Sequence, residues 1–208
     1  MIPVKPGKIV CVGRNYVEHA KELGHEVPAE PLIFLKPNTS LLASGDAIRL
    51  PSVSQQVEHE AEIGVVVGRR LRHATLEDGE RAIGGITCVN DVTARDLQRK
   101  DGQWTRAKGF DTFCPVGPRV ASGLDWRTVE VRCRVNGLER QRGHASEMQF
   151  PIPLLLAYIS GIMTLEPGDL IVTGTPAGVG LLRDGDVVEV EIPGVGVLSN
   201  PVKADNHR

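Results

Sequence analysis

The sequence predicts a β-rich α+β fold with a few short helices, and three observations support this fold class. Its 208 residues include 23 glycines and 14 prolines, spread singly between short apolar runs, which is typical of many strands joined by turns. Residues 129–135 alternate between apolar and other side chains and precede Asn136-Gly137, the strongest short signal of a hairpin. Residues 63–67 form a β-branched run, which indicates a strand covered on both faces.

Composition and charge exclude several classes of function. The chain carries 24 basic and 26 acidic residues, so nothing in its net charge of -2 favours nucleic acid or an anionic membrane as partner. No run is long enough to span a bilayer, and residues 1–7 lack the apolar region of a secretory signal. The four cysteines contain no CxxC pair and are expected to be small buried hydrophobes. We therefore expect a reduced, cytoplasmic location.

The first part of the chain reads as strands around one helix. Residues 9–13, 32–36 and 47–50 are expected strands, the second ended by Pro37. Asn15 is expected to cap a helix over residues 16–23 that Gly24 closes. His19 and Glu22 share a face of that helix. The pair is either a surface contact or a general base oriented by a carboxylate, and the residues alone favour the surface contact.

Three glutamates lead into the β-branched run. Glu58, Glu60 and Glu62 are spaced two apart, so a strand would turn them to one face. Carboxylates that enter a covered strand repel one another and lose hydration, which is costly unless a cation joins them. A divalent metal is the simplest such cation, and a solvated strand face is the equally weighted alternative at this point.

The rest of the chain adds further candidate residues. Strand 85–90 delivers Asp91 at its end, where an acid is either a ligand or a turn residue. Thr93 is expected to cap a short helix that contains Arg95 and Gln98, and Lys108 lies among small and aromatic residues. Further expected elements are a capping-box helix from Thr75, an apolar helix over residues 154–163, strands 170–173 and 187–192, a final strand 195–198 and a frayed tail from Asp205.

The glycine-rich loop 174–180 follows a strand but does not resemble a phosphate-binding loop. It lacks the lysine and the spacing of a P-loop, and no helix pattern follows it, so a nucleotide site is rejected. Its backbone N–H groups and Thr175 are still suited to bind a carboxylate.

Taken in order, six segments of the chain resemble the fumarylacetoacetate hydrolase family, in particular its short acylpyruvase and oxaloacetate decarboxylase branch. They are residues 12–16 (VGRNY), 34–37 (FLKP), 59–64 (HEAEIG), 90–98 (NDVTARDLQ), 104–110 (WTRAKGF) and 173–180 (TGTPAGVG). The resemblance implies a mixed β-sandwich roll, a single catalytic domain over residues 1–208 and a homodimer.

The resemblance also implies the site. A Mg²⁺ or Mn²⁺ ion, which Ca²⁺ could replace in crystals, would be held by Glu60, Glu62 and Asp91 but not by Glu58, and such oxygen ligands suit these metals. His19 and Glu22 match the catalytic dyad of the family, and Lys108 matches its active-site lysine. The positions that hold a substrate carboxylate or oxyanion correspond to Arg95, Gln98 and Thr175.

The activity that the resemblance implies is metal-dependent cleavage of a C–C bond in a small 2-oxo acid. The substrate would be an acylpyruvate such as fumarylpyruvate, with oxaloacetate decarboxylated at the same site. An isomerase, decarboxylase or hydratase acting on ring-cleavage products of the 2-hydroxyhepta-2,4-diene-1,7-dioate type is the alternative. A non-catalytic metal-binding module is disfavoured because the dyad and the lysine are present. Lid residues around 22–31 are expected to decide selectivity.

Overall fold

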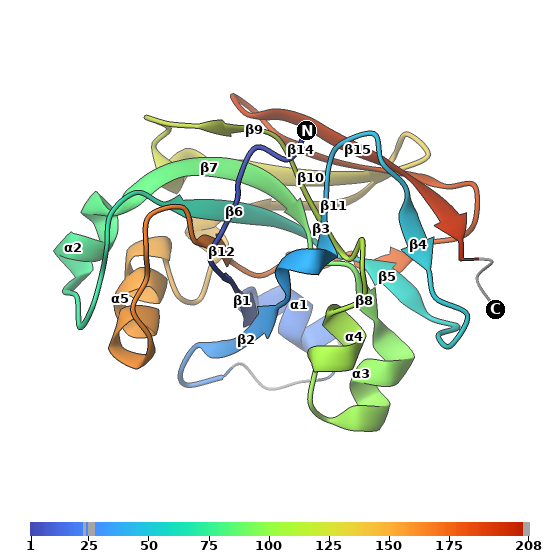
Figure 1. Ribbon diagram of the computed structural model, residues 1–208, viewed down its shortest axis with the longest axis horizontal. Helices are drawn as coiled ribbons and strands as arrows, with labels where there is room; N and C mark the ends of the chain where they lie inside the picture. The colour runs from blue at the N-terminus through green and yellow to red at the C-terminus, as the bar shows by residue number, and fades with distance from the viewer. Residues whose placement is uncertain (23, 25–27, 206–208) are drawn as a thin grey trace.

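The computed structural model describes residues 1–22, 24 and 28–205 (Figure 1). The described strands form three sheets, and the predicted β-rich fold is confirmed. The larger sheet has the order β2-β1-β12-β6-β7-β9-β3, the second β11-β10-β14-β15-β4 and the smallest β13-β5-β8. Part of the predicted lid over residues 22–31 lies outside the described residues.

The elements have the following bounds. In the larger sheet they are β1 Ile9–Gly13, β2 Leu32–Lys36, β3 Leu41–Leu42, β6 Ala61–Val67, β7 Ile83–Asn90, β9 Cys114–Ala121 and β12 Leu170–Val172. In the second they are β4 Ile48–Leu50, β10 Glu130–Val135, β11 Leu138–His144, β14 Val187–Ile192 and β15 Gly196–Ala204, and in the smallest β5 Val57–His59, β8 Thr93–Ala94 and β13 Gly180–Leu181. The α-helices of the described chain are α1 Val17–Glu22, α2 Leu76–Arg81, α3 Arg95–Asp101, α4 Thr105–Lys108 and α5 Ile152–Ile162.

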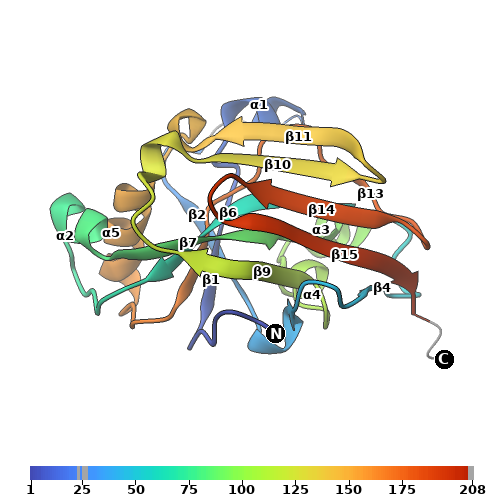
Figure 2. The ribbon, with the colours of Figure 1, turned by 90° about the horizontal axis from the view of Figure 1, so that it is seen from above.

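The second sheet lies over one face of the larger one, as Figure 2 shows for β14 and β15 above β7 and β9. The main apolar core lies between the sheets and includes Ile63 and Val65 of β6 together with Val188 and Val190 of β14. A smaller apolar cluster covers the opposite face of the larger sheet. The prediction that residues 63–67 form a strand covered on both faces is therefore confirmed, and burial of these β-branched side chains stabilises the sandwich.

The helices gather at two places. Helices α2 and α5 pack against each other at one end of the larger sheet, whereas α1, α3 and α4 lie elsewhere, beside β2 and β8 (Figure 1). Helix α2 begins with the predicted capping box, in which Thr75 and Asp78 bond each other's backbone N–H groups. None of the helices in the described ranges is both long and apolar enough to cross a membrane.

The predicted hairpin is confirmed. Strands β10 and β11 pair antiparallel with Val135 opposite Leu138, which leaves Asn136 and Gly137 as a two-residue turn. Their φ angles are 53° and 77°, the left-handed values that a type I′ turn needs and that asparagine and glycine adopt at least cost.

Three expectations about element ends are wrong. Helix α3 begins at Arg95, because Thr93 belongs to strand β8 and its hydroxyl donates to the carbonyl of Asp91. The last strand continues to Ala204 rather than ending at residue 198. Asp205, expected to start a frayed tail, donates its backbone N–H to the carbonyl of Leu50 at 2.9 Å, and the rest of that expected tail, residues 206–208, lies outside the described residues.

Asn15 is not the expected cap of helix α1, because its side chain binds two other segments. Its Nδ2 donates to the carbonyls of Phe150 (3.1 Å) and Thr173 (2.8 Å), and its Oδ1 accepts the N–H of Phe150 (2.8 Å). Asn15 is fully buried. The residue therefore ties the end of β1 to the loops that follow β11 and β12.

We expect the substitution Asn15→Ala to lower the free energy of unfolding by about 2–4 kcal/mol, because it leaves three buried backbone groups without partners. Denaturant titration measures the change. Asn38→Ala is the matched control, since Asn38 is exposed and donates to Pro6 at 2.8 Å, and it should cost about 1 kcal/mol or less. Equal effects of the two substitutions would contradict the role given to Asn15.

Candidate active site

At Glu60 the chain passes from the smallest sheet to the larger one, and the candidate site lies at this crossing. Strand β5 pairs with β8 and β13, whereas β6, one residue later, pairs with β7 and β12. Glu60 lies between the two strands, where its N–H donates to Oδ1 of Asn90 (3.0 Å) and its carbonyl accepts the N–H of Asp91 (2.8 Å). The side chains at the start of β6 and at the end of β7 therefore meet.

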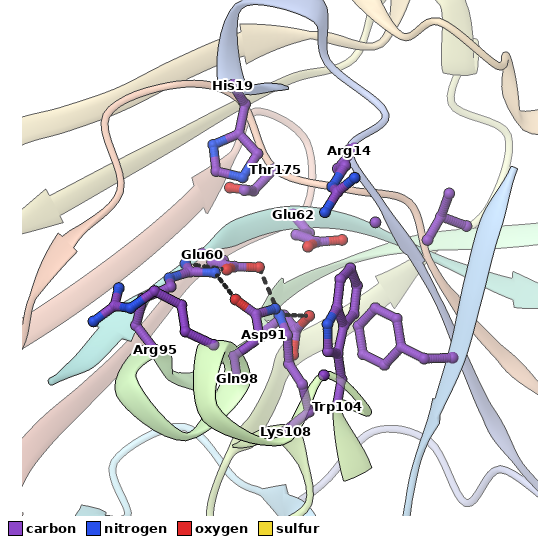
Figure 3. A pocket seen from close by; sticks show the side chains of 15 residues that line it. Arg14, His19, Glu60, Glu62, Asp91, Arg95, Gln98, Trp104, Lys108 and Thr175 are labelled. Carbon is purple, nitrogen blue, oxygen red and sulfur yellow. Dashed lines mark hydrogen bonds and ion pairs between the residues drawn. The ribbon is translucent and has the colours of Figure 1, made fainter. Parts of the chain in front are cut away.

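A cluster of three carboxylates occupies this junction. Each of Glu60, Glu62 and Asp91 offers one carboxylate oxygen to this cluster, and the three oxygens lie within 4.8 Å of one another. The three residues are 5%, 1% and 1% exposed. Figure 3 shows their side chains pointing into one cavity. The structure thus brings together the three acids predicted as metal ligands.

Two lysines partly neutralise this cluster. Lys108, at the end of α4, donates to Glu60 (2.8 Å) and to Oδ2 of Asp91 (2.6 Å). Lys36, at the end of β2, donates to Oδ1 of Asp91 (2.6 Å). Both lysines are 2% exposed. Burial alone would lower the pKa of Lys108, but Asp91 and Glu60 outweigh it and raise this pKa above its usual value.

The pKa values of the two glutamates in the cluster, Glu60 and Glu62, are shifted in opposite directions. Burial opposes ionisation of Glu60, but Lys108 and Arg95 outweigh it and lower the pKa of Glu60. Glu62 is governed by burial and by repulsion from Asp91 and Glu60, which raise its pKa well above the usual range. The N–H of Gly174 is the hydrogen-bond donor to Glu62. Of these two glutamates, Glu62 is therefore the one whose negative charge the protein itself compensates least.

Glu58, the first of the three spaced glutamates, does not join the cluster. It accepts hydrogen bonds from Nε of Arg95 (2.8 Å) and from Gln56 (2.7 Å). Arg95 also binds Glu60, and its NH1 donates to Oε1 of Gln98 at 2.7 Å. Glu58 therefore orients Arg95, and the strand break at Glu60 separates it from the other two acids.

Thr175, predicted to bind substrate, uses its hydroxyl within the protein. The hydroxyl donates to the carbonyl of Ala61 (2.9 Å) and accepts from Nε2 of Gln141 (2.7 Å). A contact in which this hydroxyl donates to a substrate would require the bond to Ala61 to break.

The glycine-rich loop after β12 binds carboxylates of the protein itself. Gly174 donates its N–H to Glu62, and Gly178 donates its N–H to both carboxylate oxygens of Glu22 (3.0 and 3.2 Å). Gly178 has φ 100°, and a Cβ there would lie 2.0 Å from the carbonyl oxygen of Arg140, so only glycine fits. The loop therefore serves two acidic residues on different elements.

His19 and Glu22 form a pair above the carboxylate cluster. Nδ1 of His19 lies 3.2 Å from Oε2 of Glu22, with His19 4% exposed and the Glu22 side chain 34% exposed. When Nδ1 donates to Glu22, Nε2 of His19 carries the lone pair of the ring. Figure 3 shows the imidazole directed into the cavity above Glu60. The pair is thus not the simple surface contact that the residues alone favoured.

These side chains line a cavity of about 220 Å³. All of the predicted site residues except Glu22 line the cavity. Glu22 is hydrogen-bonded to His19, which does line it. Sequence reasoning gave no role to Arg14 and Trp104, which also line it, or to Lys36, which anchors Asp91. All three belong to segments that carried the family resemblance, but no local pattern in the sequence singles out any of them.

The residues present fit a divalent metal. Three buried carboxylates are hard oxygen donors, and Glu62 lacks a cationic side chain within salt-bridge distance among the described residues. The remaining cavity leaves room for further oxygen ligands from water or substrate. Mg²⁺ and Mn²⁺ prefer such donors and keep open positions.

The chain is similar to known proteins over nearly its whole length. Residues 8–203 match the family model described as fumarylacetoacetate (FAA) hydrolase C-terminal. The chain is 45% identical over 195 residues to a mitochondrial oxaloacetate decarboxylase of Dictyostelium discoideum, which covers 90% of this chain and 89% of that protein.

Two crystal structures share the fold. One is 2-hydroxyhepta-2,4-diene-1,7-dioate isomerase from Mycobacterium marinum, with a TM-score of 0.91 and 45% identity over 99% of this chain and 78% of that one. The other is fumarylpyruvate hydrolase from Pseudomonas aeruginosa in complex with Mn²⁺ and pyruvate, with a TM-score of 0.91 and 32% identity over 97% of this chain and 91% of that one. The fold, the matched residues and these relatives together show that the chain belongs to the fumarylacetoacetate hydrolase family.

Proposed function

We propose that the protein cleaves a C–C bond of a small 2-oxo acid with the help of a divalent metal. The observation that carries this proposal is the buried cluster of Glu60, Glu62 and Asp91 beneath the His19–Glu22 pair. Relatives that act on oxaloacetate or fumarylpyruvate support the substrate class.

Glu60, Glu62 and Asp91 would hold Mg²⁺ or Mn²⁺. The ion would supply Lewis-acid stabilisation of the negative charge that develops on the 2-oxo oxygen when the bond breaks. Lys108 lies against two of these carboxylates, so its ammonium group is placed to stabilise the same charge. Arg95 and Gln98 line the cavity beside the cluster and would position the carboxylate next to the keto group. Thr175 would support this position once its hydroxyl is released from Ala61.

In an acylpyruvate, His19 would act as general base. Glu22 holds Nδ1, and Nε2 takes a proton from water as its oxygen attacks the distal carbonyl. The C–C bond then breaks, the carboxylic acid leaves, and the pyruvate enolate receives a proton at its terminal carbon. In oxaloacetate, the same enolate would form by loss of carbon dioxide, and this route needs no attacking water.

An isomerase of ring-cleavage products is the second candidate, because the Mycobacterium marinum isomerase is 45% identical to this chain. Isomerisation would use the same enolate-stabilising groups but would move a proton between carbons without breaking the chain. A homodimer and a cytoplasmic location remain predictions for this protein.

A substrate panel tests the proposal. The protein is stripped of metal and assayed with fumarylpyruvate, acetylpyruvate, oxaloacetate and 2-hydroxyhepta-2,4-diene-1,7-dioate, each with Mg²⁺, with Mn²⁺ or with chelator. We expect pyruvate from at least one of the first three substrates, loss of more than about 100-fold of the rate in chelator, and recovery with either metal. A thermal unfolding temperature that rises with added Mn²⁺ gives a readout independent of turnover.

Full activity after exhaustive removal of metal would contradict the metal site. Turnover of the dienedioate alone, without a C–C bond being broken, would favour the isomerase.

A further inference from the structure

The side chain of Gln141 joins two segments of the candidate active site. The residue belongs to β11 and is 1% exposed, and the described residues that line the cavity do not include it. Its Oε1 accepts the N–H of Ala61 at 3.0 Å and lies 2.9 Å from Nδ1 of His59. Its Nε2 donates to the hydroxyl of Thr175 at 2.7 Å and to the carbonyl of Pro176 at 2.8 Å. One buried amide group therefore uses both of its N–H donors and both lone pairs of its oxygen.

The partners fix the orientation of this amide. The N–H of Ala61 can only donate and the carbonyl of Pro176 can only accept, so a reversed amide would place donor against donor and acceptor against acceptor. Nδ1 of His59 must then carry the proton that it donates to Oε1. Thr175 accepts from Gln141, so its own proton is directed to the carbonyl of Ala61 at 2.9 Å. A buried network in which every group is satisfied in one arrangement holds its members rigidly.

The first segment that Gln141 holds is the start of β6. His59 and Ala61 stand on either side of Glu60, and Glu62 follows directly after Ala61. Because Gln141 binds the side chain of His59 and the N–H of Ala61, the main chain at Glu60 has little freedom to turn. These two bonds therefore help to fix the direction in which the carboxylate of Glu60 enters the cluster.

The second segment is the loop 174–178, which Gln141 binds at its middle. The first residue of this loop donates its N–H to Glu62, and the last donates its N–H to Glu22. A displacement of the middle of the loop would move both donors relative to β6. The contact with Gln141 therefore controls how the loop and the strand that carries Glu62 are spaced.

We propose that Gln141 is a positioning residue that sets the affinity of the site for a divalent ion. It acts through geometry, because it holds loop 174–178 at a fixed distance from the start of β6 and so keeps the carboxylates of Glu60 and Glu62 at the spacing that an ion requires. This inference rests on the proposed function, in which these two carboxylates and Asp91 hold the metal.

The competing role for Gln141 is structural only, since a buried amide with satisfied hydrogen bonds contributes to stability wherever it lies. Asn200 offers the comparison within the same sheet. It is also 1% exposed, and its Nδ2 donates to the carbonyls of Ala43 and Asp46, both at 2.8 Å. The described lining of the cavity does not include Asn200 either. Only a positioning role would make these two amides differ in their effect on the metal.

Substitutions of similar size separate the two roles. The proteins are the wild type, Gln141→Met, Gln141→Glu and the control Asn200→Leu. For each protein we would measure the dissociation constant of Mn²⁺ by calorimetry, the EPR spectrum of the bound Mn²⁺ and the free energy of unfolding in chelator by denaturant titration. Unfolding in chelator reports the structural contribution of the amide, whereas the first two measurements report the geometry of the site.

We expect Gln141→Met to weaken Mn²⁺ binding by about 10- to 100-fold, the usual cost of losing a group that orients metal ligands, and to alter the EPR spectrum of the ion that still binds. Asn200→Leu should bind Mn²⁺ within about threefold of the wild type and leave the spectrum unchanged. Both variants lose buried hydrogen bonds, so both should be less stable than the wild type in chelator.

Gln141→Glu separates geometry from charge. Glutamate keeps an acceptor for Ala61 but loses at least one of the two donors to the loop, and a negative charge at this position would by itself strengthen the binding of a cation. Because the loop contacts are weakened, we expect Mn²⁺ to bind about three- to tenfold more weakly than to the wild type. This variant also decides the question if Gln141→Met does not fold.

An unchanged dissociation constant in Gln141→Met, or an equal loss in Asn200→Leu, would overturn the inference in favour of the structural role. Unchanged or tighter binding in Gln141→Glu would overturn it as well. If the wild type itself bound no Mn²⁺, the proposed metal site would fail, and this result differs from wild-type binding that the substitutions leave unchanged.

Discussion

The substitution Glu62→Gln is expected to reduce metal-dependent turnover by at least about 10²- to 10³-fold. Glu62 contributes one of the three carboxylates within 4.8 Å of one another, and glutamine keeps the size of the side chain but removes its charge. Affinity for a divalent ion depends on the number of charged ligands, so Mn²⁺ binding should weaken in parallel. Calorimetry with Mn²⁺ and steady-state kinetics measure the two effects.

The same substitution should not destabilise the metal-free protein. Glu62 is buried beside Asp91 and Glu60, and the side-chain carbonyl of the introduced glutamine could still accept the N–H of Gly174. Removal of a repelled, buried carboxylate should therefore leave the free energy of unfolding in chelator unchanged or higher. Added Mn²⁺ should stabilise the wild type but not the variant.

Glu58→Gln is the matched control. Glu58 lies two residues before Glu60, as Glu62 lies two residues after it, but Glu58 binds Arg95. It should bind Mn²⁺ within about threefold of the wild type. If Glu58→Gln lost the metal and Glu62→Gln kept it, the assignment of the ligands would be wrong.

The substitution His19→Ala is expected to slow hydrolysis of an acylpyruvate by about 10²- to 10⁴-fold, the usual contribution of a general base. Decarboxylation of oxaloacetate should fall by less than about tenfold, because that route needs no activated water. The rates of pyruvate formation from the two substrates, measured on one preparation, give the comparison.

His144→Ala is the control for this prediction. Nε2 of His144 lies 3.0 Å from Glu130, so it is also a histidine–glutamate pair, but it is half-exposed and does not line the cavity. Its loss should leave both rates unchanged. Equal loss of hydrolysis and decarboxylation in His19→Ala would count against the separate roles of the base and the enolate-stabilising groups.

Local patterns in the sequence predicted the elements better than their ends. The Asn136-Gly137 turn and the capping box at Thr75 are confirmed because both depend on neighbouring residues alone. The predicted cap Asn15 binds Phe150 and Thr173 instead, since a polar side chain takes whichever buried partner the tertiary structure offers. Such long-range partners cannot be read from local spacing.

The last strand shows the same limit. The sequence predicts a final strand over residues 195–198, and the residues that follow it, Ser199, Asn200 and Pro201, are of types common in turns. Asn200 instead donates to the carbonyls of Ala43 and Asp46, both at 2.8 Å, which satisfies its side chain inside the sheet. Tertiary hydrogen bonds here outweigh the local preference for a turn.

The candidate site could be predicted only from residue spacing and the family resemblance together. Spacing suggested Glu60 and Glu62, but only the pairing of β6 with β7, in which Ala61 lies opposite Asn90, brings Asp91 beside them. The family resemblance implied Asp91 as the third ligand in advance, but it did not give this pairing. It gave no role to Lys36 or Arg14, since a charged residue at the end of an apolar strand looks like an ordinary strand end until its burial and contacts are known.

The loop from Gly174 to Gly178 has a consequence for how the sequence of this protein can diverge. One short stretch of main chain binds an acid of the carboxylate cluster at one end and the acid paired with His19 at the other. A substitution that shifts this loop would displace both acids at once, so few substitutions there should be tolerated. New substrate preferences are therefore expected to arise through replacements elsewhere in the lining of the cavity, outside this loop.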